Sequence, residues 1–150
     1  IMGIPTQEEI FARFPLLFSQ KDLSIQESCM AWGLSHGEGW NPLVVELCEK
    51  INAYLKEKEG EGYTIVPIGE DIPEGAEKHL YQVEFAQIKS KWYRLRVYII
   101  GGDEVIHRFI SEAENKSADI CEGCGKRFPE TVEKVEGWTH SYCETCRTKA

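Results

Sequence analysis

The chain has 150 residues, a hydrophobic fraction of 42% and a formal net charge of −8. This composition is typical of a globular protein and excludes global disorder. The acidic balance argues against a general nucleic-acid-binding protein, which needs clustered Lys and Arg to neutralise phosphates. We find no run of about eighteen apolar residues and no signal peptide, and the cysteines Cys29 and Cys48 stand far apart in the sequence. These features favour a protein of the reducing cytoplasm without a membrane partner.

The first helix is predicted to begin at Thr6, which opens a capping box over residues 6–9. Apolar residues follow at helical spacing, and Pro15 limits or kinks the helix. Residues 21–39 lack a periodic pattern, so we expect them to be irregular.

A second helix is predicted to begin at Asn41, with Asn as the cap and Pro42 in the first helical position. Its apolar stripe, which includes Cys48, extends to Leu55. The charged segment 56–62 is expected to be the solvated end where the helix dissolves.

The strongest strand signal predicts an antiparallel hairpin. Residues 81–85 and 93–99 alternate between apolar and polar side chains, and the turn is expected near residues 89–90. A short strand is predicted within 63–68, and Asp103 is expected to cap a third helix. The order of elements predicts an α+β fold, a small antiparallel sheet covered by about three helices.

Near the end of the chain, two C-x2-C pairs are separated by eighteen residues. This spacing is typical of a zinc site with four thiolate ligands, Cys121, Cys124, Cys143 and Cys146. Four protein ligands leave no position for a substrate water, so one structural Zn²⁺ is expected rather than a catalytic one. We divide the chain into a core domain, 3–118, and a zinc-binding module, 119–150, of the ribbon or treble-clef-like type. Disulfides or a redox C-x2-C pair are the alternatives.

Basic and aromatic residues gather in the predicted hairpin, in the one segment where bases outnumber acids. They are Lys89, Lys91, Trp92, Arg94, Arg96 and Tyr98. Alternation places the last four on one face, which could bind phosphates and stack on bases. In the alternative interpretation, Arg94 or Arg96 pairs with Glu84 across the strands or packs over Trp92.

Two further groups of residues could carry chemistry. His36 and Glu38 lie in a Gly-rich loop and could form an acid/base pair, although the glycines and Trp40 are also typical of a tight turn with a packing anchor. A nuclease site built on the knuckles is disfavoured, because His140 is the only histidine between Cys124 and Cys143.

Four short stretches together resemble a family of small uncharacterised proteins from phage and bacterial, often prophage, genomes. They are FPLLF at 14–18, GEGW at 37–40, KSKW at 89–92 with LRVY at 95–98, and CEGCG at 121–125 with Gly137, Trp138 and Cys143. Members of this family often end the zinc segment in Cys-x2-His, where this chain has Cys146. The resemblance implies a phage or prophage setting and a bound zinc, and it supplies no activity.

Three functions are therefore considered. The first is a non-enzymatic, phage-type accessory protein in the host cytoplasm that binds a host or phage macromolecule, with a protein as the expected partner and inhibition of a host defence or nucleic-acid-handling protein as its effect. The second is binding of nucleic acid or a nucleotide through the hairpin, residues 89–98. The third is an enzyme that uses the loop containing His36 and Glu38.

Overall fold

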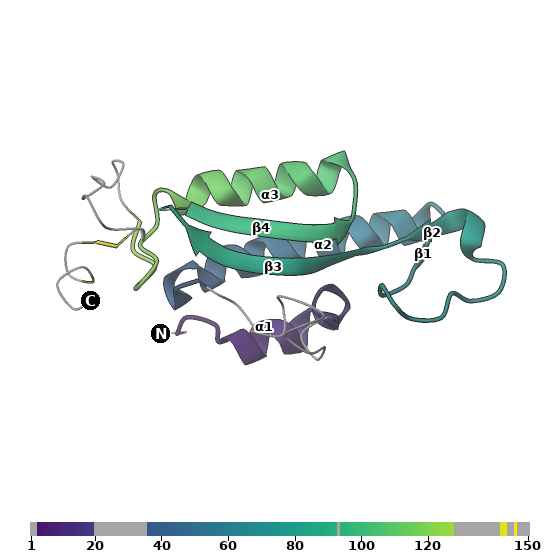
Figure 1. The fold of residues 1–150 in the computed structure, drawn as a ribbon, viewed down its shortest axis with the longest axis horizontal. Coiled ribbons are helices and arrows are strands. Elements are labelled where there is room, and N and C mark those ends of the chain that lie inside the picture. Colours follow the sequence, from purple (N-terminus) through teal and green to yellow (C-terminus); the bar gives the residue numbers. More distant parts are fainter. Residues whose placement is uncertain (1–2, 20–35, 93, 128–141, 144–145, 147–150) are drawn as a thin grey trace.

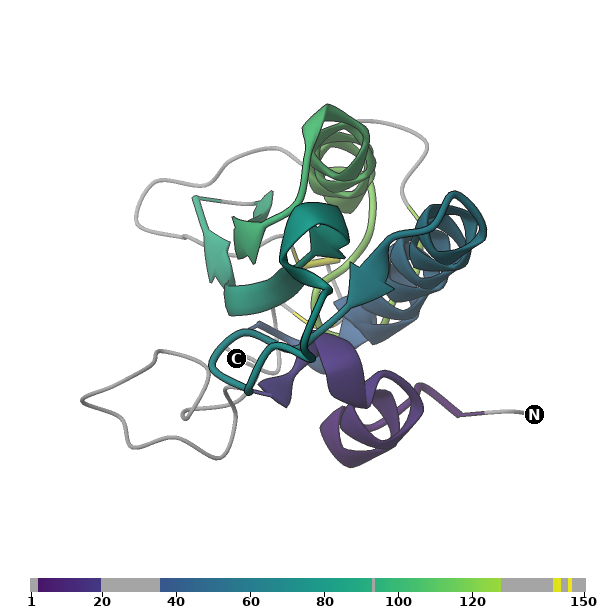
Figure 2. The same ribbon diagram turned by 90° about the vertical axis from the view of Figure 1, so that its right-hand side faces the viewer.

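The computed structural model describes residues 3–19, 36–92, 94–127, 142–143 and 146. In these residues the predicted α+β fold is confirmed: three α-helices accompany a small antiparallel sheet, and four cysteines cluster near the C-terminus. Figure 1 shows α2 (Asn41–Gly60), α3 (Glu104–Ser117) and the hairpin of β3 (Val83–Lys91) and β4 (Arg94–Gly101) running along the long axis. In the end-on view of Figure 2, these elements and α1 (Gln7–Arg13) surround a common centre.

The remaining elements are short. They are the 3-10 helices Pro15–Leu17, Glu38–Trp40 and Glu77–His79 and the strands β1 (Thr64–Ile65) and β2 (Leu80–Tyr81). β1 pairs in parallel with β2, so the strand predicted within 63–68 is reduced to two residues. None of the described helices is both long and apolar enough to cross a membrane. The expectations for Cys29, Tyr93, His140 and most of 21–39 concern residues outside the described part of the chain.

The ends of α1 and α2 agree only in part with the caps predicted from the sequence. The hydroxyl of Thr6 accepts a hydrogen bond from the backbone N–H of Glu9 at 3.2 Å, as the capping box predicts. Asn41, by contrast, is not the cap of α2, because a 3-10 turn precedes it and Trp40 takes the cap position. The side chain of Asn41 is buried and bonds elsewhere in the fold. At its other end, α2 continues to Gly60, because Lys and Glu are good helix formers even without an apolar stripe.

The hairpin turn lies further along the chain than predicted. β3 and β4 stay paired as far as Lys91 and Arg94, so residues 89–90 belong to the strand and Trp92 to the turn. A two-residue connection favours Gly, Asn or Asp. The absence of these residues conceals the turn in the sequence. Trp92 adopts a positive φ of 50° there.

Helix α3 protects the outer edge of β4. The backbone N–H of Leu95 donates to the hydroxyl of Ser117 at 2.9 Å, and that of Val97 donates to the carboxylate of Glu114 at 3.1 Å. Two side chains of one helix thus take the place of a third strand. This satisfies donors that would otherwise attract another chain.

The core lies between the hairpin, α2, α3 and the N-terminal helices. Its largest fully buried side chains include Trp40, Phe18, Phe85, Ile51 and Leu95. Each such side chain contributes about 1.5–3 kcal/mol relative to an exposed position. Cys48 is buried in the same cluster, and burial raises the pKa of its thiol, so it behaves as a small apolar residue.

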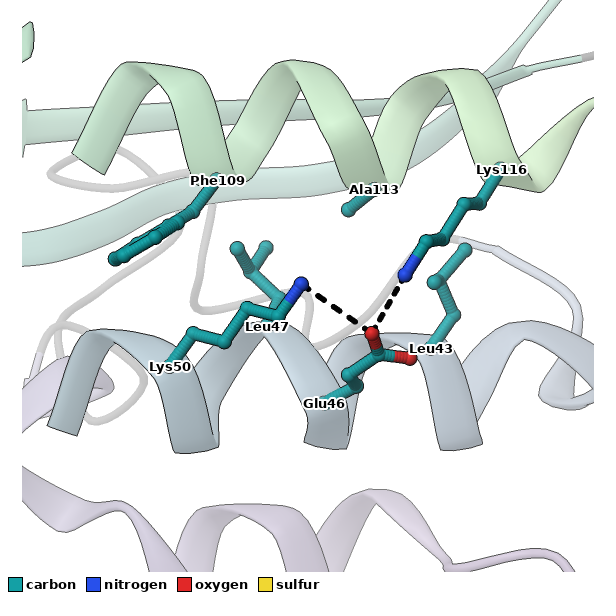
Figure 3. Close-up of a pocket in the computed structure, with 7 residues that line it drawn as sticks. All are labelled: Leu43, Glu46, Leu47, Lys50, Phe109, Ala113 and Lys116. Atoms are coloured by element: carbon teal, nitrogen blue, oxygen red, sulfur yellow. Dashed lines mark hydrogen bonds and ion pairs between the residues drawn. The ribbon is translucent and has the colours of Figure 1, made fainter. Parts of the chain in front are cut away.

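The exposed seam between α2 and α3 is closed by charged side chains. Lys50 and Lys116 both reach the carboxylate of Glu46, at 3.3 and 2.7 Å, and Figure 3 shows them converging over the seam. The hydrogen bond from Lys116 lowers the pKa of Glu46. The cavity beneath is about 10 Å³, which holds at most one water. This seam is therefore packing and not a ligand site.

Asp103 joins the C-terminal part of α2 to the start of α3. One carboxylate oxygen caps α3 by accepting from the N–H groups of Val105 and Ile106, which confirms the predicted cap. The other oxygen accepts from the hydroxyl of Tyr54 at 2.7 Å. The ammonium of Lys58 lies 5.2 Å from the ring centre of Tyr54 and also faces the rings of Tyr63 and Tyr81. A cation among aromatic rings further ties α2 to β1 and β2.

Replacement of Tyr54 by Phe tests this junction. The variant keeps the ring and loses only the hydrogen bond to Asp103, so we expect the free energy of unfolding to fall by about 1 kcal/mol. Urea unfolding followed by circular dichroism measures the change. Tyr98→Phe is the matched control, because the Tyr98 side chain is exposed on the hairpin, and we expect it to change nothing. Equal stabilities of the two variants would contradict the assignment.

Candidate functional site

The four cysteines of the two C-x2-C pairs converge on one point. Their sulfur atoms all lie within 4.8 Å of one another, and those of Cys124 and Cys143 are 3.8 Å apart. Tetrahedral coordination with metal–sulfur bonds of about 2.3 Å places sulfurs about 3.8 Å apart. The cluster is therefore positioned to bind a metal ion, as the spacing predicts.

Backbone donors support the cluster as well. The N–H of Cys143 donates to the sulfur of Cys121 at 3.2 Å, and the N–H of Cys146 donates to that of Cys143 at 3.5 Å. The bond from Cys146 lowers the pKa of Cys143 to about 7, whereas desolvation raises that of Cys146 to about 12. Four thiolates in one place repel each other unless a cation neutralises them. The four sulfurs thus fit a divalent metal ion. They would fill all four positions of a tetrahedron and leave none for water or a substrate.

The first C-x2-C turn is seated on the Gly-rich loop. The N–H of Gly39 donates to the carbonyl of Glu122 at 2.8 Å, and the indole N–H of Trp40 donates to the carbonyl of Ile120 at 2.9 Å. A Cβ on Gly39 would lie 2.3 Å from the carbonyl oxygen of Cys121, and one on Gly37 equally close to that of Glu122. The glycines are required because two backbones meet here. The division at residue 118 stays a prediction, as does the choice between ribbon and treble clef, which depends on residues outside the described part.

Sequence reasoning missed Glu122, whose side chain is 1% exposed. One carboxylate oxygen accepts from the N–H of Gly37 at 2.9 Å, and the other accepts from the hydroxyl of Ser90 at 3.0 Å. This residue connects the knuckle, the Gly-rich loop and the hairpin tip. An acid between two ligand cysteines is ordinarily solvated, so no pattern in the sequence predicts its burial.

His36 and Glu38 line the same polar cavity of about 280 Å³ together with Thr6, Gln7, Glu8 and Asn41. Glu38 is exposed, whereas His36 is half-buried. The amide nitrogen of Asn41 donates to the carbonyl of Pro5, so its oxygen accepts from Nε2 of His36 at 2.7 Å. Nδ1 of His36 is buried and has no partner among the described residues. Neither ring nitrogen is available to a ligand, which argues against acid/base catalysis here.

The basic residues of the hairpin lie directly opposite each other. Lys89 pairs with Arg96, and Lys91 pairs with Arg94, in the strand register. Leu95 and Val97 point into the core while Arg94 and Tyr98 are exposed, so the predicted alternation holds along β4. We name the surface formed by Lys89, Lys91, Trp92, Arg94, Arg96 and Tyr98 the hairpin face.

No carboxylate in the described part of the chain lies within ion-pair distance of the four cations of the hairpin face. The expected alternative, a pair with Glu84, is wrong, because Glu84 lies opposite Ile100, is fully buried and bonds to Ser19. The guanidinium of Arg94 donates to the amide oxygen of Asn115 at 3.5 Å, and the ammonium of Lys89 lies over the ring of Tyr98. Like charges opposite each other destabilise a hairpin.

Trp92 is 62% exposed at the tip of the hairpin face. Its positive φ of 50° places it in a region that bulky side chains rarely occupy. It therefore does not follow the strand alternation that predicted its orientation. An exposed aromatic side chain in a strained turn is typical of a contact residue rather than a packing residue.

No protein-family model, curated protein or solved structure matches this chain. The resemblance to phage and prophage proteins is thus neither supported nor opposed by these comparisons.

The buried His36 predicts a dependence of stability on pH. Burial lowers its pKa below 6.5 in the folded state, although Asn41 and the nearby Glu122 oppose this. The unfolded chain therefore binds the proton more readily, and the free energy of unfolding falls as the pH drops below about 6.5.

We expect His36→Gln to lose this contribution, on the order of 1 kcal/mol between pH 7.5 and 5.5. Urea unfolding of the unaltered protein and of His36→Gln at each pH measures the difference. Any release of metal by acid affects both proteins equally and therefore cancels. Parallel stability curves would show that His36 is not buried as described.

Proposed function

We propose that the four-cysteine cluster binds one structural Zn²⁺. Zinc accepts four thiolates in a tetrahedron without a preference for an open site, and the separation of the sulfurs fits this geometry. When bound, the ion would neutralise the thiolates and fix the two C-x2-C turns to each other. No catalytic water is part of this proposal.

Elemental analysis of the purified protein tests the metal. We expect one zinc per chain, and Cys121→Ser is expected to lower the affinity for zinc by at least about a hundredfold through loss of a ligand. Cys48→Ser is the matched control, because Cys48 is buried in the core away from the cluster. A metal other than zinc, or equal zinc contents of the two variants, would refute the assignment.

We propose further that the hairpin face binds single-stranded nucleic acid. Two observations carry this proposal. Lys89 lies opposite Arg96 and Lys91 lies opposite Arg94, and no carboxylate of the described residues lies within ion-pair distance of these four cations. Phosphates placed between such pairs would relieve their repulsion and release counterions. The proposed ligand thus supplies the negative charge that the described residues do not place at this position.

Aromatic side chains favour a single strand over a duplex or an acidic protein. Trp92 and Tyr98 are 62% and 46% exposed beside the cations. Unpaired bases can stack on such rings, and each stack contributes about 1–3 kcal/mol. The net charge of −8 repels nucleic acid elsewhere on the surface, so binding would be confined to this face and steeply dependent on salt.

This proposal refines the broader expectation of an accessory protein that binds a host or phage macromolecule. It names nucleic acid as that macromolecule, in place of the protein partner expected first. An acidic protein would satisfy the same cations but would not require an exposed Trp92. The measurement below separates the two.

Fluorescence anisotropy with a labelled oligothymidine of about 15 nucleotides tests the proposal. We expect binding at low salt, with Arg96→Ala reducing the slope of log Kd against log salt by about 0.7. Trp92→Ala is expected to weaken binding about tenfold through lost stacking, without a change in that slope.

Lys56→Ala is the matched control, since it removes an equal charge from an exposed position of α2, and we expect no effect. Absence of binding at low salt, or an equal response to Lys56→Ala and Arg96→Ala, would refute the proposal. In that case, direct binding of a labelled acidic polypeptide, weakened by Arg96→Ala, would indicate a protein ligand.

A further inference from the structure

Glu122 stands between two cysteines of the cluster, but its side chain points away from the sulfurs. It bonds Gly37 through one oxygen and Ser90 through the other, at 2.9 and 3.0 Å. Ser90 lies between Lys89 and Lys91 in β3. The metal cluster and the hairpin face are therefore separated by one side chain and one hydrogen bond, and Figure 1 places the hairpin tip at the same end of the molecule as the knuckle.

The position of Glu122 depends on the turn that carries it. Within this turn, the N–H of Gly125 donates to the carbonyl of Cys121 at 2.9 Å, and Gly125 adopts a φ of +80°. The N–H of Cys124 reaches only the sulfur of Cys121, at 3.5 Å. A bound metal fixes both sulfurs at one point and so fixes the backbone between them. Without the metal, no bond holds the sulfurs at one point, and the turn loses this constraint.

The end of the hairpin that Glu122 holds is the end that carries like charges. Lys91 and Arg94 form the last pair, and Lys89 and Arg96 lie two residues further in. Their repulsion favours opening of the tip. The hydrogen bond between Ser90 and the buried carboxylate of Glu122 resists that opening. Loss of this hydrogen bond would therefore favour fraying of the tip.

We propose that Glu122 couples metal occupancy to the hairpin face, so that the metal-loaded protein presents a closed, binding-competent tip and the metal-free protein a frayed one. The effect on binding rests on the proposed function of the hairpin face. The closure of the tip does not depend on any ligand of that face. Glu122 acts as a positioning residue and does not contact the ligand.

Hydrogen exchange of the hairpin amides tests the coupling without any ligand. We expect removal of zinc with EDTA to speed exchange in residues 88–96 about tenfold, the loss of one charge-assisted hydrogen bond, with the middle of α3 unchanged. Ser90→Ala removes the contact without altering the knuckle. Its tip should exchange about tenfold faster even with zinc bound, and EDTA should add little. In the zinc-loaded Glu122→Gln variant, the tip amides should exchange at a rate between those of the unaltered protein and Ser90→Ala. This variant should still bind one zinc per chain.

Glu57→Gln is the matched control, because it removes an acid from an exposed position of α2. We expect it to exchange like the unaltered protein. Tip exchange that is insensitive to both EDTA and Ser90→Ala would overturn the coupling.

Oligothymidine binding then separates the two proposals. The coupling predicts that Ser90→Ala and EDTA each weaken binding severalfold. Their effects on the affinity should not add, because both act through the same contact. If the zinc-loaded protein binds no oligonucleotide while tip exchange responds as expected, the coupling stands and the proposed ligand is wrong. If binding is present but exchange and affinity ignore EDTA, the ligand stands and the coupling is wrong.

Discussion

The close approach of two backbones, the C-x2-C turn at 121–125 and the loop at 37–40, determines how the C-terminal end of this protein is assembled. The carbonyl of Glu122 accepts from the N–H of Gly39, and no side chain could be accommodated between them. Trp40 completes the contact, since its ring is fully buried in the core while its indole N–H reaches Ile120. A metal ion bound by the four cysteines would hold the turn in shape and therefore also the loop that precedes α2.

The hairpin depends on its neighbours because two strands alone are marginally stable in water. α3 satisfies the edge of β4 through Ser117 and Glu114, and the bulge near Ala86 keeps both Phe85 and Ile88 in the core. These contacts offset the repulsion between the cations at the tip. Functional surfaces commonly contain such locally unfavourable pairs, which the rest of the fold tolerates.

The two ends of α2 are secured by different chemistry. At its start, hydrogen bonds join the loop at 37–40 to the knuckle. Toward its end, Asp103 accepts from Tyr54, and Lys58 lies among tyrosine rings. Between them α2 packs against α3, and its buried apolar side chains belong to the same core cluster as those of the hairpin. At the seam between α2 and α3 the cations have carboxylate partners, whereas those of the hairpin face have none among the described residues, which is why the proposed binding surface lies at the hairpin.

Local patterns in the sequence determined the elements that depend on near neighbours: the Thr6 and Asp103 caps, the antiparallel hairpin and the four-cysteine cluster, because caps, alternation and ligand spacing act over a few residues. The turn at Trp92 was misplaced because the usual turn residues are absent, and the cap of α2 was misassigned because the Asn41 side chain bonds elsewhere. Only the tertiary structure decided the roles of Gly39 and Glu122. A close backbone approach and a buried carboxylate depend on partners more than eighty residues away in the sequence, and no local pattern encodes such a distance.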